Sequence, residues 1–169
     1  KGGLLLYALT RTLAPRSVIE FGTAHGFGAA YIGSALRENG DGRLYTLEGM
    51  DIRVRLAREL LSRFSLSSIV QVVAGDFKDT IPATIEAAQP LDLVFCDGDK
   101  SVDFTKMQFD TSMAALSHGG HMFFDDIYFN PEIRSLWESF VQHERVSNAC
   151  VFSGRWGLLN IVPEESAAP

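Results

Sequence analysis

Cysteine is scarce in this sequence of 169 residues, which contains only Cys96 and Cys150. Two cysteines cannot build a framework of several disulfides, and their spacing matches no zinc-binding motif. Cys96 lies inside an apolar run, where a free thiol behaves as a small buried hydrophobic group. The composition therefore excludes a disulfide-stabilised miniprotein and a structural zinc domain.

Long apolar runs and clusters of basic residues are also missing. No run is long enough to cross a bilayer, and no signal-peptide pattern is present, so we expect a cytoplasmic protein with no membrane partner. Lysine and arginine total 15 against 21 acidic residues, for a net charge of −6. Without a basic block, binding to nucleic-acid phosphates is not expected.

The chain also lacks internal repeats, low-complexity segments and linkers. Its hydrophobic fraction of 46% and charged fraction of 21% are typical of a globular protein. A chain of this length can bury a substantial core. We therefore predict a single domain over residues 1–169.

Two hydrophobic periodicities alternate along the chain. Helices are expected at 4–13, 29–38, 52–64, 80–88, 102–116 and 131–143, with Pro82 in a first helical turn. Strands are expected at 17–21, 43–48, 69–76, 91–97 and 119–126, and a hairpin at 145–152 and 156–162. The pattern predicts an α/β fold, with a Rossmann-like, doubly wound and mostly parallel seven-stranded sheet. The terminal antiparallel hairpin is expected to leave a reversed strand at one edge.

Every predicted parallel strand ends in an acidic residue. These residues are Glu20, Glu48, Asp76, Asp97 and the pair Asp125-Asp126. Ligands of doubly wound sheets bind beyond the carboxyl ends of the strands, near the point where the strand order reverses. The acids therefore mark the expected site.

A glycine-rich turn follows the first strand, in the sequence VIEFGTAHGFG. Gly22, Gly26 and Gly28 follow the spacing G-x-x-x-G-x-G, whereas the dinucleotide fingerprint is G-x-G-x-x-G. Glycines allow the backbone to approach a ligand closely, although glycine after a strand is often only a turn. Glu20 precedes the turn, where its charge favours a cationic ligand group over a pyrophosphate.

S-adenosylmethionine offers such cationic groups, an ammonium and a sulfonium, together with a ribose. Glu48 is placed to accept hydrogen bonds from the ribose hydroxyls, a role that NAD-binding enzymes share. Asp76 and Phe77 could offer an acceptor and an apolar face to the adenine. A core position is equally open for Phe77.

Five segments together resemble the class I S-adenosylmethionine-dependent methyltransferases. VIEFGTAHG is similar to the E-x-G-x-x-x-G form of the first motif of that family, and LYTLEG, VVAGDF, LDLVFCDGDK and GGHMFFDDIYF follow in the family's order. The last two resemble the O-methyltransferase branch that includes the catechol and caffeoyl-CoA enzymes and related bacterial proteins. The likeness extends over residues 4–162. It implies cofactor contacts from Glu20, Gly22, Thr23, Ala24, Gly26, Glu48, Gly49, Asp76, Phe77 and Asp97.

The resemblance also implies a metal site and a catalytic residue. Asp97, Asp125 and Asp126 match the positions that bind a divalent metal in catechol-type enzymes, and oxygen ligands suit Mg²⁺, Ca²⁺ or Mn²⁺. Position 126 is usually Asn in that branch, so the metal requirement stays open, as does a capping role for Asp126. Lys100 matches the branch's catalytic lysine. Its alternative is a surface lysine that pairs with Asp99 or Asp103.

The expected function is O-methylation of a small hydroxylated, catechol-like substrate, with assistance from a divalent metal left open. An NAD-dependent oxidoreductase and a non-catalytic nucleoside-binding domain are the alternatives. The first helix and residues 127–131 are expected to wall the cleft, with Tyr128, Phe129 and Trp156 as aromatic lining. Exposed aromatic residues and the first helix could equally form a homodimer surface.

Overall fold

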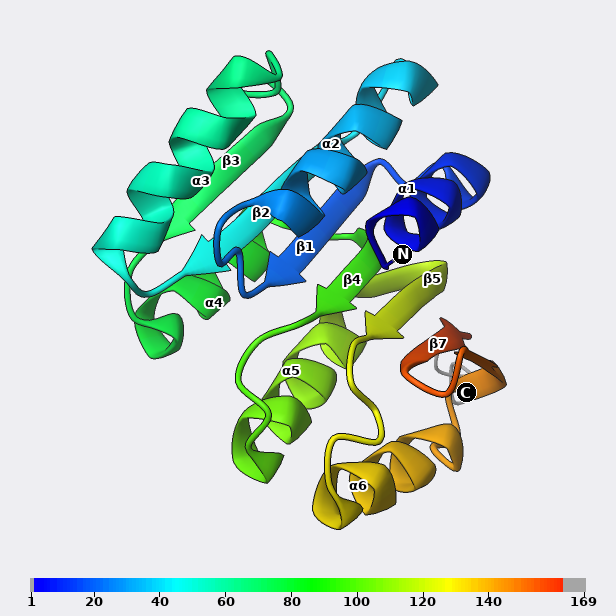
Figure 1. The fold of residues 1–169 in the computed structure, drawn as a ribbon. Coiled ribbons are helices and arrows are strands. Elements are labelled where there is room, and N and C mark those ends of the chain that lie inside the picture. The colour runs from blue at the N-terminus through cyan, green and yellow to red at the C-terminus, as the bar shows by residue number, and fades with distance from the viewer. Residues whose placement is uncertain (1, 163–169) are drawn as a thin grey trace.

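The computed structural model describes residues 2–162, in which helices alternate with strands as the periodicity predicted (Figure 1). The helices are α1 (Gly2–Leu13), α2 (Phe27–Asn39), α3 (Asp51–Arg63), α4 (Phe77–Ala88), α5 (Val102–Ala115) and α6 (Pro131–Val141). The strands are β1 (Ser17–Phe21), β2 (Arg43–Glu48), β3 (Val70–Ala74), β4 (Leu91–Cys96), β5 (Leu116–Phe124), β6 (Val146–Phe152) and β7 (Trp156–Ile161). The ends of the predicted domain, residue 1 and residues 163–169, lie outside the described residues.

All seven strands form one sheet in the order β3-β2-β1-β4-β5-β7-β6. The strands β1 to β5 pair in parallel, and the order reverses between β1 and β4. This reversal is the topological switch point, where ligands bind in doubly wound folds. The predicted fold class is therefore confirmed.

The hairpin supplies the antiparallel strand that was predicted at one edge of the sheet. β7 pairs antiparallel with both β5 and β6, so it lies inside the sheet and β6 forms the edge. Burial explains this order, because most residues of β7 are buried, whereas those of β6 are all exposed or half-buried. The less apolar strand of the hairpin thus takes the solvated edge.

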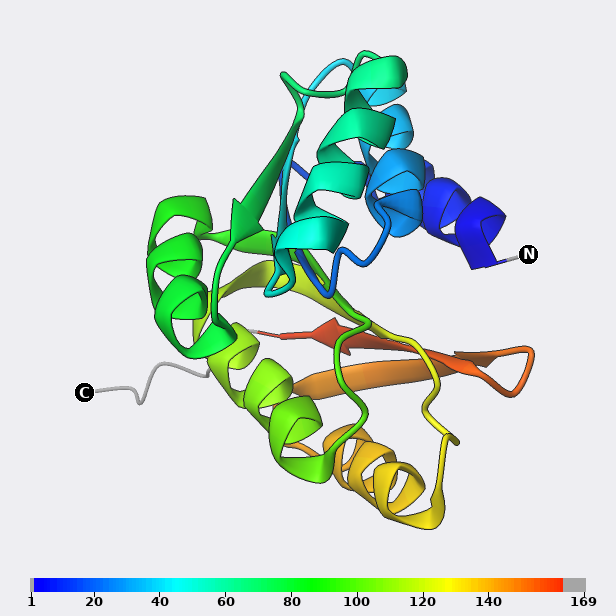
Figure 2. The same ribbon diagram turned by 60° about the vertical axis from the view of Figure 1, so that its left-hand side comes forward.

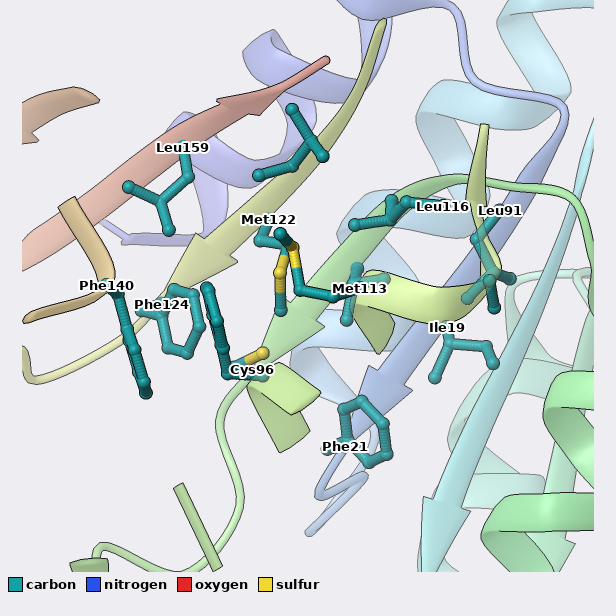
Figure 3. Close-up of a cluster of buried hydrophobic side chains, with 14 of the residues drawn as sticks. Ile19, Phe21, Leu91, Cys96, Met113, Leu116, Met122, Phe124, Phe140 and Leu159 are labelled. Carbon is teal, nitrogen blue, oxygen red and sulfur yellow. The ribbon is translucent and has the colours of Figure 1, made fainter. Parts of the chain in front are cut away.

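Helices cover both faces of the sheet (Figure 2). Helices α1, α2 and α3 pack on one face, and α4, α5 and α6 pack on the other. Figure 3 shows part of the core between the sheet and helices α4 to α6, in which Ile19, Phe21 and Met122 of the sheet pack near Met113 and Phe140. Cys96 is buried in the same cluster, as the apolar run around it indicated.

Helix α4 begins three residues earlier than predicted. Asp76 caps it by accepting a hydrogen bond from the Lys78 N–H. Pro82 therefore lies inside the helix rather than in its first turn, which corrects the prediction. The proline cannot donate to the carbonyl four residues earlier.

Across residues 2–162, no helix combines the length and the apolar character needed to cross a membrane.

Candidate functional site

The carboxyl ends of β1, β4 and β5 bring the glycine turn and two aspartates together. The Asp97 N–H donates to the Phe21 carbonyl, and the Asp125 N–H donates to the Cys96 carbonyl, each at 3.1 Å. Asp97 and Asp125 thus follow neighbouring strands at the same level of the sheet. The pairing places both aspartates beside the switch point.

The glycine turn packs tightly against its surroundings. Gly22 has a φ of +94°, and a Cβ there would lie 2.6 Å from the Asp97 carbonyl oxygen. A Cβ on Gly28 would lie 2.2 Å from Glu20 Oε1. Gly26, at φ +86°, forms the N-terminal boundary of α2. Glycine is therefore required here for the chain's own packing as well as for the approach of a ligand.

Glu20 lies beneath this turn, with 1% of its surface exposed. Thr46 donates its hydroxyl hydrogen bond to Glu20, and the hydroxyls of Thr46 and Thr23 are 2.6 Å apart. Burial raises the pKa of Glu20 to about 8, an effect that the hydrogen bond from Thr46 only partly opposes. The side chain supports the turn from below, and its contact with a cofactor ammonium stays a prediction.

Glu48 holds the turn from the side of β2. One carboxylate oxygen accepts from the Ala24 N–H and the other from the Met50 N–H, both at 2.9 Å. Gly49 lies between these two groups, and its Cβ position is 3.6 Å from the Gly75 carbonyl. Both oxygens of Glu48 therefore fix backbone, and the predicted contact with ribose hydroxyls would use their remaining lone pairs.

Asp76 and Phe77 lie at the end of β3, at the start of α4. Asp76 is exposed and serves as the N-cap. Phe77 is half-buried, and its ring centroid is 5.0 Å from that of Phe104 on α5. Both residues line a groove of ≈ 410 Å³ between α4 and α5. Phe77 thus belongs partly to the core and partly to a groove wall.

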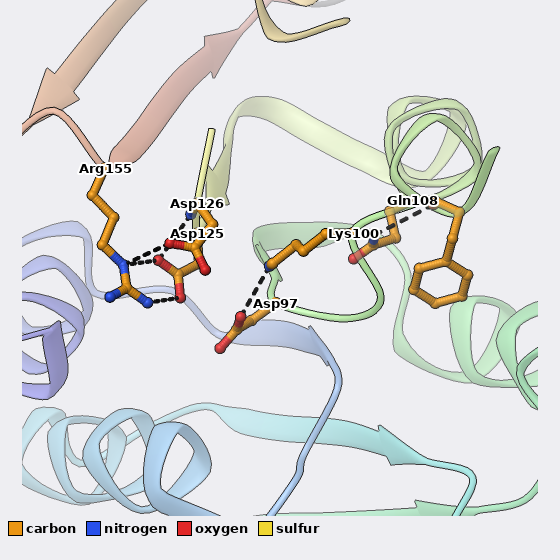
Figure 4. A network of polar contacts seen from close by, with 7 residues as sticks. Asp97, Lys100, Gln108, Asp125, Asp126 and Arg155 are labelled. Carbon is orange, nitrogen blue, oxygen red and sulfur yellow. Dashed lines mark hydrogen bonds and ion pairs between the residues drawn. The ribbon is translucent and has the colours of Figure 1, made fainter. Parts of the chain in front are cut away.

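Three aspartates and two basic residues form a charged network at the ends of β4 and β5 (Figure 4). Lys100 Nζ lies 3.0 Å from Asp97 Oδ1 and pairs with neither Asp99 nor Asp103. Arg155 Nε lies 2.7 Å from Asp125 Oδ1, and its Nη2 lies 2.7 Å from Asp125 Oδ2. Each of the three acids therefore has a basic side chain of the network within ion-pair distance.

The two main carboxyl groups of this network have opposite pKa shifts. Burial raises the pKa of Asp97 to about 6, although the charge of Lys100 opposes the shift. Burial acts in the same direction on Asp125, but hydrogen bonds and charge from Arg155 lower its pKa below the ordinary value. The Arg155 guanidinium therefore determines the ionisation of Asp125.

Asp126 occupies a left-handed conformation, with φ +57°. Its N–H donates to Asp125 Oδ1 at 2.9 Å, and its carbonyl accepts from Phe129 N at 2.9 Å. Its carboxylate lies 3.0 Å from Arg155 Nε. Asn and Asp are the side chains that best tolerate this backbone, which accounts for an acid at a position that the branch usually fills with Asn.

These aspartates do not fit a divalent cation as they stand. Among residues 2–162, no three His, Cys, Asp or Glu side chains are grouped so as to hold a metal. More directly, Arg155 occupies both oxygens of Asp125 and one of Asp126, and Lys100 occupies one of Asp97. A metal would have to displace the guanidinium and sit beside two cations.

Arg155 is the residue that the sequence interpretation missed, because residues 153–155 were read only as the turn of the hairpin. The signal available was its place directly before β7, the strand that returns next to β5. Its carbonyl accepts from the Ile127 N–H at 3.0 Å, which ties the turn to the loop after β5.

An open cavity of ≈ 240 Å³ lies beside this network. Its walls combine aromatic rings with charged groups, and they come from Gly2, Gly3, Leu6, Phe27, Gly28, Tyr31, Phe95, Asp97, Asp125, Arg155 and Trp156. α1 and Trp156 therefore wall the cavity, as predicted. Tyr128 and Phe129 do not line it and are exposed.

Lys100 also lines a second, enclosed pocket with space for about one water. Thr105 and Gln108 of α5 contribute to its wall, together with apolar residues of α6. Within the described part of the chain, Thr105 Oγ1 and Gln108 Oε1 are buried with no hydrogen-bond partner. A water bridging these atoms is the arrangement that such buried polar groups favour.

The fold and the site define a doubly wound α/β protein with a ligand-binding edge, carrying acids at its switch point. The model of the Methyltransf_24 family, described as a methyltransferase domain, matches residues 19–127. The chain belongs to this family of methyltransferase domains. The membership expected from the five motifs is thus confirmed.

Two curated relatives share the name catechol O-methyltransferase. That of Niastella koreensis is 33% identical over 99 residues, which cover 58% of this chain and 44% of that enzyme. That of Mycobacterium tuberculosis is 34% identical over 112 residues, which cover 66% of this chain and 49% of that enzyme. Each match thus spans less than half the length of the relative.

Solved structures agree with the fold. The O-methyltransferase TomG from Streptomyces achromogenes, involved in tomaymycin synthesis and solved in complex with S-adenosylmethionine, superposes with a TM-score of 0.81. It is 22% identical, and the superposition covers 96% of this chain and 80% of that protein. At this identity the likeness supports the architecture alone.

Proposed function

We propose that the protein is an S-adenosylmethionine-dependent methyltransferase that methylates an oxygen of a small hydroxylated molecule. One observation carries the proposal: the Asp97–Lys100 pair and an aromatic-walled cavity lie together beside the glycine turn at the switch point. The relatives named catechol O-methyltransferase support a phenol or catechol as acceptor. Aromatic walls suit such a flat ring.

The cofactor fits the chemistry of this edge. When bound, S-adenosylmethionine supplies a methyl group on a positively charged sulfur. Carboxylates and aromatic faces are the groups that favour a cation, and Asp97, Phe95 and Trp156 provide both kinds around the cavity. The residues expected to contact it are those of the glycine turn, Glu48, Gly49, Asp76, Phe77 and Asp97.

The chain's own residues contribute to the reaction by positioning the substrate and by accepting its hydroxyl proton. Lys100, 17% exposed, is held by its ion pair with Asp97, which lines the cavity. As the free amine, Lys100 would take the proton of the substrate hydroxyl, and the ammonium so formed would stabilise the oxyanion of the substrate. A bound S-adenosylmethionine would supply the methyl group to that oxygen and leave as neutral S-adenosylhomocysteine.

A divalent metal is not part of the proposed mechanism. The aspartates implied as its ligands are already paired with Arg155 and Lys100. Since these contacts engage the carboxylate oxygens, no step is assigned to a metal ion.

The proposed partner is a small molecule, not a nucleic acid or a membrane, in a cytoplasmic setting.

A homodimer is also proposed, because Leu4 of α1 and Phe27 and Tyr31 of α2 leave apolar side chains exposed on neighbouring helices. Light scattering coupled to size exclusion would measure the mass, and a monomer at every concentration would contradict the dimer.

Titration calorimetry against S-adenosylhomocysteine and NAD tests the cofactor. Binding of the first alone is expected, and binding of NAD alone would replace the proposal with the oxidoreductase alternative. Transfer of a labelled methyl group to a panel of phenols and catechols tests the reaction. Cofactor binding without transfer to any acceptor would favour the non-catalytic domain.

A lysine pair provides the control for the catalytic assignment. Lys100→Met should lower methyl transfer about 10²-fold or more while cofactor affinity stays the same. Lys106 lies on α5 and is exposed, and among residues 2–162 it pairs with Asp110 alone, so Lys106→Met should leave the rate unchanged. Equal rates for both variants would remove Lys100 from the mechanism.

A further inference from the structure

Arg155 makes contacts of the kind expected of a bound cation. Its guanidinium engages Asp125 through two nitrogens and Asp126 through one. Paired contacts of arginine with carboxylates are among the strongest charge-assisted hydrogen bonds. Asp125 is nearly buried, with 8% of its side chain exposed, whereas half of the Arg155 side chain is exposed.

The hairpin holds Arg155 in this position. Its N–H donates to the Phe152 carbonyl at 3.1 Å, and its carbonyl accepts from Ile127 at 3.0 Å. The guanidinium also lies 5.1 Å from the ring centroid of Trp156. These hydrogen bonds join the hairpin turn to the loop after β5, so the backbone of the fold holds the guanidinium beside the aspartates.

One face of the guanidinium remains available to a ligand. Arg155 is half-exposed and lines the ≈ 240 Å³ cavity together with Asp97 and Trp156. Within residues 2–162, its Nη1 donates to no acceptor. The two N–H groups of Nη1 are therefore free to bind a ligand in the cavity proposed for the methyl-accepting substrate.

We propose that Arg155 takes the place of a divalent cation in the acceptor site. It pairs with Asp125 and Asp126 and compensates part of their charge, and Nη1 donates to the substrate oxygen as negative charge develops on that atom. Methyl transfer then needs no metal. The inference rests on the proposed O-methyl transfer, and it adds the group that binds the oxygen.

Manganese binding tests this without reference to activity. The full chain, freed of metal by dialysis against chelator, is titrated with Mn²⁺ and the free ion is followed by electron paramagnetic resonance. The wild type should leave Mn²⁺ free up to about 1 mM, whereas Arg155→Met should bind about one ion per chain through the released carboxylates. One tightly bound Mn²⁺ on the wild type, lost in Asp125→Asn, would overturn the proposal.

Methyl transfer gives the second readout. With EDTA present, the wild type should keep its rate within about twofold, and Arg155→Met should lose about 10² in rate at unchanged S-adenosylhomocysteine affinity. Added Mn²⁺ should restore activity to Arg155→Met only. Arg134→Met is the control, since Arg134 is exposed, pairs with Glu138 and lies over the ring of Tyr128 rather than against the aspartates. A wild type that EDTA inactivates and Mg²⁺ restores would overturn the role of Arg155.

The two proposals can fail separately. Failure to bind S-adenosylhomocysteine would end the proposed function, and the manganese titration would still judge Arg155. Cofactor binding and turnover that depend on Mg²⁺ would leave the function standing and refute Arg155 as the cation.

Discussion

The two halves of the sheet's carboxyl edge use the same residue type in different ways. On the side of β1 and β2, Glu20 and Glu48 are buried to 1% and 4% exposure and bond to a hydroxyl and to backbone N–H groups. On the side of β4 and β5, Asp97 and Asp125 bond to the cations Lys100 and Arg155 next to an open cavity. The acids near β1 and β2 hold the glycine turn in its conformation, whereas those near β4 and β5 place charged groups beside the cavity.

Glu20 and Asp125 show how the partner of a buried acid affects its pKa. Neutral donors in a buried place cannot compensate a full charge, so the pKa of Glu20 rises to about 8. The guanidinium of Arg155 does compensate the charge of Asp125, and the pKa of Asp125 falls despite burial. An acid at a strand end is therefore informative about function only when its partner is known.

The largest effect is expected where the turn meets β4. Gly22→Ala would put a Cβ 2.6 Å from the Asp97 carbonyl at a φ of +94°, so the backbone must shift. We expect a loss of about 3 kcal/mol or more in the free energy of unfolding, measured by urea denaturation. Gly40 has a similar φ of +79°, but no atom of the described residues lies within 4 Å of its Cβ position, so Gly40→Ala should cost only about 1 kcal/mol. Equal losses would show that conformation alone, and not the contact with β4, requires glycine at position 22.

The second expected effect separates the two groups of acids. Glu48→Ala removes the acceptor of two backbone N–H groups at 2.9 Å, which should cost about 2–3 kcal/mol in unfolding free energy. Asp126→Asn keeps a side chain suited to its left-handed backbone and should change stability by less than about 0.5 kcal/mol. A stability loss at Asp126 as large as that at Glu48 would contradict the division between a shape-fixing half and a charged half.

The sequence predicted the frame of this edge but not its pairing. Periodicity located the strands, and parallel pairing of β4 with β5 then placed Asp97 next to Asp125. The burial of Glu20, however, depends on Thr46 of β2 and on Gly28 of α2, and the partner of Asp125 comes from a turn 30 residues later. Local patterns carry no information on which side chains meet across such crossovers.

The order of the hairpin strands escaped prediction for a related reason. Both strands had apolar character, and their relative burial became clear only once β7 was paired on both sides. That arrangement is what brings Arg155, directly before β7, to the end of β5. The missed residue and the missed strand order are thus one omission.

The third prediction concerns the pH dependence of stability and tests the buried state of Glu20. The folded pKa of about 8 lies above the ordinary value of 4.5, so the folded side chain stays protonated while the unfolded one ionises. Between these values the wild type should lose about 1.4 kcal/mol of stability per pH unit relative to Glu20→Gln. Urea denaturation of both proteins between pH 5 and pH 8 measures this. A constant difference across that range would mean that Glu20 is ionised when folded.

The smallest effect lies at the outer end of the edge, where Asp76 is exposed and caps α4. Asp76→Ala should cost about 1 kcal/mol in unfolding free energy, because the Lys78 N–H loses its acceptor. Asp76→Asn retains a capping oxygen and should cost less than half of that, since the exposed ion pair with Lys78 at 3.5 Å contributes little. Calorimetry with S-adenosylhomocysteine on the same two variants then separates capping from binding. If Asp76 also accepts from the cofactor, Asp76→Asn should weaken binding although the helix is intact, and unchanged affinity in both variants would limit Asp76 to the cap.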